Sequence, residues 1–167
     1  MILDSKNYRL EHFSDLISSL PLCAYFSFLY LAIIKNNPAK LFFIKCLSGL
    51  LFTTLTADFI KRLPYPRFLW DITRRPLGAK NTDYLSKNGE CRKDAPGFPS
   101  GHMSSTAFTL SIMSLYFVKT PVGHITNIVI VFLMAWSRWF KGVHNSFQIL
   151  AGLGYGCLGA YLTSFFL

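Results

Sequence analysis

The sequence has few cysteines, few acidic residues and few charged residues overall. Its 167 residues contain 4 cysteines, and 8 Asp and Glu residues against 17 Lys and Arg. Three cysteines fall inside apolar stretches and Cys91 stands alone in a polar one, so no disulfide framework can be drawn. His, Cys and Asp residues nowhere show the spacing of metal ligands. We therefore expect neither a bound metal nor another cofactor.

Basic residues outnumber acidic ones, and the formal net charge is +9. In a nucleic-acid-binding protein such an excess gathers in a patch or stripe on one face of the fold. Here the basic residues are dispersed between apolar segments, which argues against a nucleic acid as the partner. Their distribution favours an anionic lipid head group instead.

Long uncharged runs make up much of the remaining sequence. Residues 16–34 carry no charge over nineteen positions, roughly the length that a helix needs to cross a bilayer. This run is longer than a typical signal-peptide core and lacks an A-x-A-like exit, so we expect it to stay in the protein. Further spans are expected at 41–60, 103–118, 120–137 and 145–167. The sequence predicts an all-α integral membrane protein, a multi-pass bundle of about five transmembrane helices.

The two ends of the chain differ in character. Residues 1–15 form either a short interfacial helix or a solvated tail, and residues 16–167 form the membrane-embedded domain. In the last span Gly152, Gly156 and Ala160 recur at every fourth position, which lets a neighbouring helix approach closely. We interpret this pattern as helix packing.

Residues suited to chemistry gather at one membrane face. If the spans alternate across the bilayer, the N-terminal segment, the loop 61–101 and the loop 138–145 lie on the same side. The candidate side chains belong to the second and third of these segments and to the helix ends beside them; they are Lys61, Arg74, Arg75, Ser100, Gly101, His102, Arg138 and His144. We therefore expect the active site at this face.

Two histidines, several cations and a small Ser-Gly turn at a helix start suit phosphoryl transfer. Preorganised cations and backbone N–H groups stabilise the charge that develops on the phosphoryl oxygens. One neutral imidazole can attack phosphorus, and the other can protonate the leaving oxygen. The residue types thus indicate a reaction through a phosphohistidine.

Two ordered motifs resemble those of the type 2 phosphatidic acid phosphatase and haloperoxidase superfamily. The first is "PSGH" at 99–102, and the second is "SRWFKGVH" at 137–144, in which five residues separate Arg138 from His144. The resemblance covers roughly residues 46–165. It implies that His144 is the nucleophile and His102 the general acid. It also implies a phosphate cradle of Lys61, Arg75, Ser100, Gly101 and Arg138.

The first motif of this superfamily matches less well. Its members usually leave six residues between a Lys and an Arg-Pro pair, whereas thirteen separate Lys61 from Arg75 here. Either an insertion has lengthened the segment, or Arg67, with six residues before Arg74, takes the cationic position. We favour Lys61 because it ends an apolar helix, and Arg74 stays an alternative to Arg75.

A second departure lies four residues after His144. Superfamily members commonly carry an Asp there, and this chain has Gln148. One helical turn on, the amide oxygen of Gln148 can accept the Nδ1–H of His144 and leave Nε2 for phosphorus, but it brings no charge. Dolichyl diphosphate phosphatases of the superfamily are similar in having Gln at this place, so we count Gln148 with the catalytic residues.

The predicted activity is hydrolysis of a phosphate or diphosphate ester on a membrane lipid, either of the phosphatidate type or a polyprenyl diphosphate. Vanadate-dependent haloperoxidases of the same superfamily resemble soluble bundles, so the expected membrane spans argue against that branch. The alternative function is lipid-phosphate binding with weak catalysis, because the carboxylate is missing. The sequence does not indicate an oligomeric state.

Overall fold

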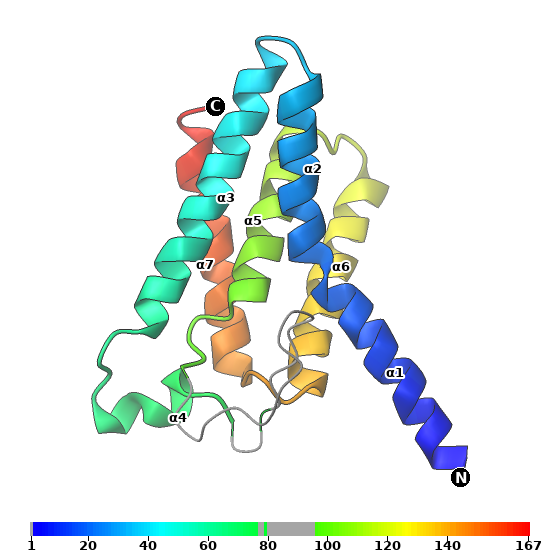
Figure 1. Cartoon of the computed structure of the whole chain (residues 1–167), viewed down its shortest axis with the longest axis vertical. Coiled ribbons are helices and arrows are strands. Elements are labelled where there is room, and N and C mark those ends of the chain that lie inside the picture. Colours follow the sequence, from blue (N-terminus) through cyan, green and yellow to red (C-terminus); the bar gives the residue numbers. More distant parts are fainter. Residues whose placement is uncertain (1, 77–78, 80–95) are drawn as a thin grey trace.

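The chain folds into helices in the part that the computed structural model describes, which is residues 2–76, 79 and 96–167. Figure 1 shows them. In chain order they are α1 (Ile2–Ser18), α2 (Leu20–Ile34), α3 (Ala39–Lys61), the 3-10 turn η1 (Arg67–Leu69), α4 (Trp70–Thr73), α5 (Gly101–Tyr116), α6 (Pro121–Phe140) and α7 (Ser146–Ser164). The all-α prediction is confirmed for these residues.

Helix α5 lies at the centre of the bundle. It packs against α7, α3, α6 and α2, and α1 packs against α6. The lower end of the bundle in Figure 1 contains the starts of α5 and α7 and the ends of α3 and α6. The C-terminus lies at the opposite end. This arrangement brings the motifs of three separate segments to one end of the bundle.

The outer surface of the bundle is rich in large apolar side chains. Phe52, Leu55 and Phe132 are examples, and each is about two-thirds exposed. Exposed apolar surface of this extent favours a hydrocarbon environment over water. Two helical segments, Leu10–Ile34 and Ala39–Lys61, are long and apolar enough to cross a membrane, by length and composition. The expected span 16–34 therefore begins inside α1 and continues through α2.

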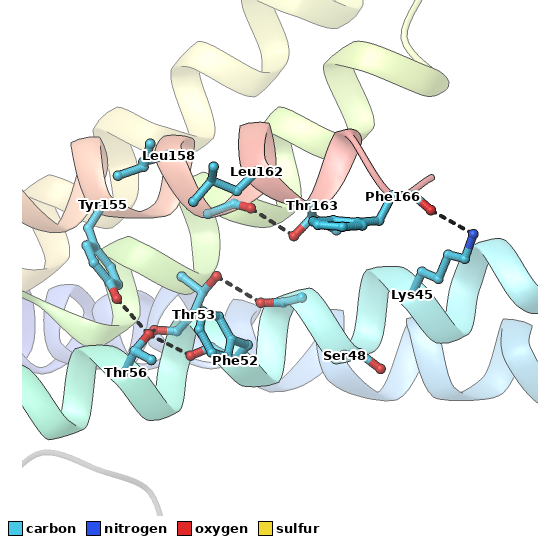
Figure 2. A pocket seen from close by; sticks show the side chains of 12 residues that line it. Lys45, Ser48, Phe52, Thr53, Thr56, Tyr155, Leu158, Leu162, Thr163 and Phe166 are labelled. Atoms are coloured by element: carbon cyan, nitrogen blue, oxygen red, sulfur yellow. Dashed lines mark hydrogen bonds between the residues drawn. The ribbon is translucent and has the colours of Figure 1, made fainter.

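A groove beside the bundle lies between α3 and α7. It measures about 500 Å³ and is lined mainly by apolar and small residues (Figure 2). Lys45 sits near one end of it and donates from Nζ to the Phe166 carbonyl oxygen at 2.6 Å. None of the predicted site residues lines this groove.

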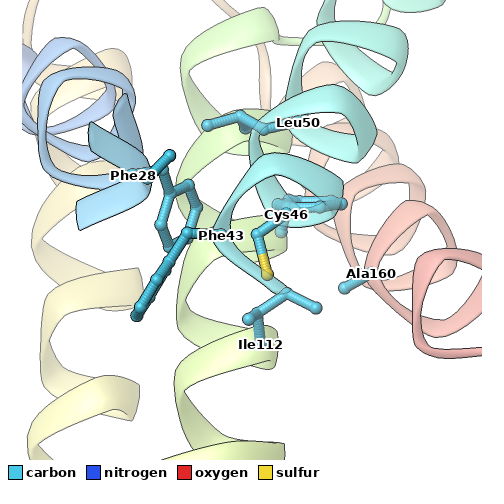
Figure 3. Packing of buried hydrophobic residues seen from close by; sticks show 8 residues of the cluster. Phe28, Phe43, Cys46, Leu50, Ile112 and Ala160 are labelled. Atoms are coloured by element: carbon cyan, nitrogen blue, oxygen red, sulfur yellow. The ribbon is translucent and has the colours of Figure 1, made fainter. Parts of the chain in front are cut away.

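A buried apolar cluster holds α2, α3, α5 and α7 together. Phe28, Phe43, Cys46 and Leu50 from the first two helices meet Ile112 of α5 (Figure 3), and all five are almost completely buried. Burying such side chains stabilises a fold by about 1.5–3 kcal/mol each when they come from water. In a bilayer, close contact between the packed side chains takes over most of this role.

Small residues on α7 allow α5 to approach closely, as the sequence predicts. A Cβ atom at Gly152 would lie 2.6 Å from the carbonyl oxygen of Ser100, and one at Gly156 would collide with the carbonyl oxygen of Ser104. Both acceptors are backbone atoms, one at the N-terminal cap of α5 and one in its first turn, so neither can move aside easily. The Gly152 contact also brings α7 against the residue that precedes α5.

We expect Gly156→Ala to lower the melting temperature of the detergent-solubilised protein. The added methyl group overpacks the α5–α7 contact, which should cost about 1–3 kcal/mol. Gly154→Ala is the matched control, because a Cβ at Gly154 meets no atom within 4 Å. Equal melting temperatures for both variants would contradict the tight α5–α7 contact.

Residues 1–15 were expected to form an interfacial helix or a solvated tail. Helix α1 runs through the expected boundary and ends at Ser18. One face of its last turns is buried, at Ser14, Ile17 and Ser18, whereas Leu16 is exposed. Figure 1 shows α1 leaving the bundle at the same end as the start of α5, so its C-terminal turns lie close to the chemical motifs.

Candidate active site

A cavity of about 320 Å³ opens where the ends of these helices meet. Six of the sequence-predicted residues line it, namely Lys61, Arg75, Gly101, His102, Arg138 and His144. The remaining wall is formed by Ser18, Pro21, Leu22, Tyr25, Thr54, Asp58, Ser105 and Val143. Cations and imidazoles thus line the same cavity as residues of α2.

The "PSGH" segment forms the start of α5. Ser100 is the N-terminal cap with extended backbone angles (φ −68°, ψ 111°), and its N–H donates to the Gln148 carbonyl oxygen at 3.1 Å. Its carbonyl oxygen accepts from the backbone N–H of Ser104 at 2.9 Å. The Ser100 side-chain oxygen is buried and has no hydrogen-bond partner among the described residues. A hydroxyl and the first N–H groups of a helix therefore lie together, an arrangement suited to an anion.

Lys61 and Arg75 line the cavity, whereas Arg67 and Arg74 do not. The Lys61 ammonium donates to Asp58 Oδ1 at 2.6 Å. It also lies 3.0 Å from the position that a Cβ of Gly101 would occupy, so a glycine there leaves room for it.

Arg74 and Arg67 instead stack on one aromatic ring outside the cavity. Their guanidinium carbons lie 3.0 Å and 5.8 Å from the ring centroid of Trp70. Arg75 lines the cavity and donates from Nε to the Pro96 carbonyl oxygen at 3.4 Å. The geometry of the loop thus separates two neighbouring arginines that the sequence spacing left as alternatives.

His144 lies in the turn between α6 and α7, and it is almost completely buried. Its Nδ1 is 3.0 Å from Gln148 Oε1. The amide nitrogen of Gln148 donates to the carbonyl oxygens of Ile72 at 3.1 Å and Arg74 at 2.6 Å. Because those two acceptors require the NH2 group, the amide oxygen must face His144. Nδ1 therefore carries the proton, and Nε2 carries the lone pair.

The position of Gln148 is itself fixed by the start of α7. The Asn145 side chain accepts from the Gln148 backbone N–H at 2.9 Å, and Gln148 Oε1 accepts from the Asn145 N–H at 3.3 Å. This reciprocal pair is a capping box. We did not predict this box from the sequence, although Asn145 followed three residues later by Gln148 is a pattern that indicates one.

Burial lowers the pKa of His144 to about 3. The hydrogen bond that His144 Nδ1–H donates to Gln148 raises the pKa in part, and the positive charges of Arg75, Arg138 and Lys61 lower it further. A buried imidazole loses the hydration that would stabilise its charged form. His144 is therefore neutral at physiological pH, as a nucleophile must be.

This lowered pKa predicts a loss of stability in acid. Between about pH 6.5 and pH 3 the unfolded chain binds a proton at His144 that the folded chain does not, so stability falls as the pH falls through this window. At pH 5 the loss relative to pH 7.5 should be about 2 kcal/mol. Thermal unfolding of wild type and His144→Asn at both pH values measures it, and an unchanged pH dependence in the variant would contradict the prediction.

The structure adds contributors that sequence reasoning missed. Ser14, Asp15 and Ser18 of α1 contact the end of α6 beside Arg138. Serines four residues apart share a helix face, but nothing in the sequence identifies the segment that this face meets.

A metal site finds no support in the described part of the chain. No group of three or more His, Cys, Asp or Glu side chains there is able to hold a metal ion. Cys91 lies outside the described residues.

Comparisons with known proteins give the family and the fold of this chain. Residues 37–166 match the PAP2 superfamily. The fold is similar to the crystal structure of the first transmembrane PAP2 type phosphatidylglycerolphosphate phosphatase from Bacillus subtilis, with a TM-score of 0.57 and 20% sequence identity. That similarity covers 94% of this chain and 76% of the other. A search of curated proteins finds no match.

Proposed function

Because this chain belongs to the PAP2 superfamily, we propose that it hydrolyses a phosphate or diphosphate ester on a membrane lipid through a phosphohistidine. The convergence of two histidines, three cations and a helix start on one cavity carries this proposal. These groups come from four separate segments of the sequence, and the fold brings them together at one cavity. We assign the nucleophile to His144 and the general acid to His102.

The first step forms a bond between His144 Nε2 and phosphorus while the ester P–O bond breaks. His102 gives its proton to the leaving oxygen, which departs as an alcohol or, from a diphosphate, as a phosphate group. In the second step water attacks the phosphohistidine, His102 takes a proton from that water, and inorganic phosphate leaves. His144 then returns to its neutral form.

The cations act on the phosphoryl oxygens throughout. We assign this role to Lys61, Arg75 and Arg138, with the Ser100 hydroxyl and the Gly101 N–H beside them. Fixed charges stabilise the transition state strongly, because they need no reorganisation. The phosphate cradle defined by these five residues therefore contributes mainly to turnover.

Gln148 serves as the orienting group of His144. Its amide oxygen holds the Nδ1 proton, and its amide nitrogen holds the loop that carries Arg75. The neutral amide also favours the second candidate function, lipid-phosphate binding with weak catalysis, because it offers no charge to an imidazolium-like intermediate. The amount of phosphate released per enzyme distinguishes the two functions.

The substrate is a lipid because the cavity lies beside an apolar surface. Pro21 and Leu22 of α2 line one side of it, and Leu22 is half exposed. A head group can thus enter the cavity while the acyl or prenyl chain remains in the bilayer. We propose that the five helices α2, α3, α5, α6 and α7 cross the membrane.

Phosphate release from the purified, detergent-solubilised protein tests the function. The assay contains a chelator and offers phosphatidylglycerolphosphate, phosphatidate or a polyprenyl diphosphate in separate reactions. The similar Bacillus subtilis protein makes the first of these the natural starting substrate. Repeated turnover on any of them supports hydrolysis, whereas saturable binding without turnover supports the second function.

We expect Lys61→Met to lower the rate by on the order of 10²–10³, because it removes one preorganised charge from the transition state. Arg67→Met is the matched control and should cost little, since Arg67 stacks on Trp70 outside the cavity. Steady-state hydrolysis by both variants measures the difference. The reverse ranking would give the cationic position to Arg67.

A further inference from the structure

Helix α1 precedes the region that matches the superfamily, yet its last turns contact the predicted phosphate cradle. The match covers residues 37–166, and α1 ends at Ser18. Ser18 lines the same cavity as His144 and Arg138. In Figure 1 the C-terminal turns of α1 lie beside the end of α6, which carries Arg138. Superfamily motifs alone therefore do not account for the whole wall of the site.

The Ser18 hydroxyl is a hydrogen-bond acceptor for two cations. Its proton is donated to the Ser14 carbonyl oxygen at 2.6 Å. Its oxygen therefore has lone pairs for other donors, and it accepts from Arg138 Nη2 and, at 3.1 Å, from Lys141 Nζ. Arg138 is only 2% exposed, so its guanidinium depends on protein acceptors for its alignment.

Further contacts fix α1 at this place. The side-chain oxygens of Ser14 and Ser137 lie 2.9 Å apart, and Ser137 Oγ donates to the Ser14 carbonyl oxygen at 3.0 Å. Both serines are fully buried. Asp15 forms an ion pair with Lys141, whose side chain is nearly buried. The serines and this ion pair hold the end of α1 against α6 on both sides of the Ser18 hydroxyl.

We infer that Ser18 is a positioning residue that aligns Arg138 for the phosphoryl group, so that α1 completes the phosphate cradle. This inference rests on the proposed function. A guanidinium stabilises phosphoryl oxygens only while its N–H groups point at them, and small misplacements in a catalytic site cost large factors in rate. Ser18 does not act on the substrate itself, because its proton is engaged by Ser14.

Inorganic orthovanadate, a mimic of the phosphoryl transition state, is the probe for this alignment. We expect Ser18→Ala to weaken inhibition of the full-length protein by orthovanadate about tenfold or more, the effect of losing one hydrogen bond to a charged group. KM for the lipid and kcat should both worsen. Ser18→Cys should have an intermediate effect, because sulfur is a weaker hydrogen-bond acceptor than oxygen. Ser18→Thr keeps the hydroxyl oxygen and should keep most of the wild-type inhibition.

Ser19→Ala is the matched control. The Ser19 hydroxyl donates a local hydrogen bond to the Leu16 carbonyl oxygen, and Ser19 does not line the cavity. Wild-type inhibition in this variant, together with weakened inhibition in Ser18→Ala and Ser18→Cys, supports the inference.

Two other results have distinct meanings. A lower melting temperature in the Ser18 variants with unchanged orthovanadate inhibition would give α1 a purely structural role and overturn the inference alone. A wild-type protein that neither releases phosphate nor binds orthovanadate would overturn the proposed function, and the inference with it.

Discussion

His144→Ala should abolish lipid phosphate hydrolysis while the protein stays folded in detergent. In the proposed mechanism this imidazole forms the covalent bond to phosphorus, and the other imidazole of the cavity, His102, is assigned to proton transfer. Loss of a nucleophile in other enzymes with covalent intermediates costs on the order of 10⁶ in rate. The measurement is phosphate release at saturating substrate, with the melting temperature recorded to confirm folding.

His124→Ala is the matched control for that variant. His124 is exposed and lies at the end of α6 far from Arg138. It should therefore keep wild-type turnover. Residual turnover in His144→Ala within a factor of ten of wild type would show that another group attacks phosphorus.

Gln148→Leu should lower the rate by a large part of the ~10⁴ that a misdirected imidazole costs in the Ser-His-Asp template. Leucine removes the acceptor that holds the proton on Nδ1, so the ring is no longer confined to the reactive tautomer. It also removes both hydrogen bonds to the loop before Arg75. Chemistry and substrate binding should therefore suffer together, and steady-state kinetics separates kcat from KM.

Gln148→Glu distinguishes these two effects. Glutamate keeps an acceptor for His144, but it cannot donate to the carbonyl oxygens of Ile72 and Arg74 and would face them with an anion. We expect partial activity with a raised KM, well above the activity of Gln148→Leu. Near-wild-type rates in both variants would show that position 148 does not orient the nucleophile.

The local motifs could be predicted because each depends on residues close in sequence. The "PSGH" segment begins α5. Arg138 lies in the last turn of α6, and His144 precedes α7. Gln148 lies four residues beyond His144, and their predicted contact is present although His144 itself stands in the turn before α7. The all-α fold could be predicted for a similar reason, because each uncharged run is one continuous stretch of sequence.

Contacts between distant segments could not be predicted. The spacing of the first motif left Lys61 and Arg67 as alternatives, and only the path of the loop after α3 separates them in space. Ser14 meets Ser137 across 123 positions, and the amide nitrogen of Gln148 meets the Arg74 carbonyl across 74. Hydroxyl and amide groups form hydrogen bonds with many kinds of partner, so their positions in the sequence do not show which partner each one meets in the fold.

The most direct measurement is identification of the phosphorylated residue. Protein mixed with lipid substrate is quenched in alkali, where phosphohistidine survives, and its peptides are analysed by mass spectrometry. We expect a phosphoryl group on His144 of the wild-type protein and none in His144→Ala. In His102→Ala the phosphohistidine should accumulate if loss of the general base slows the attack of water more than it slows the first step. A phosphoryl group on any other residue, or an unmodified His144 during active turnover in wild type and His102→Ala alike, would contradict it.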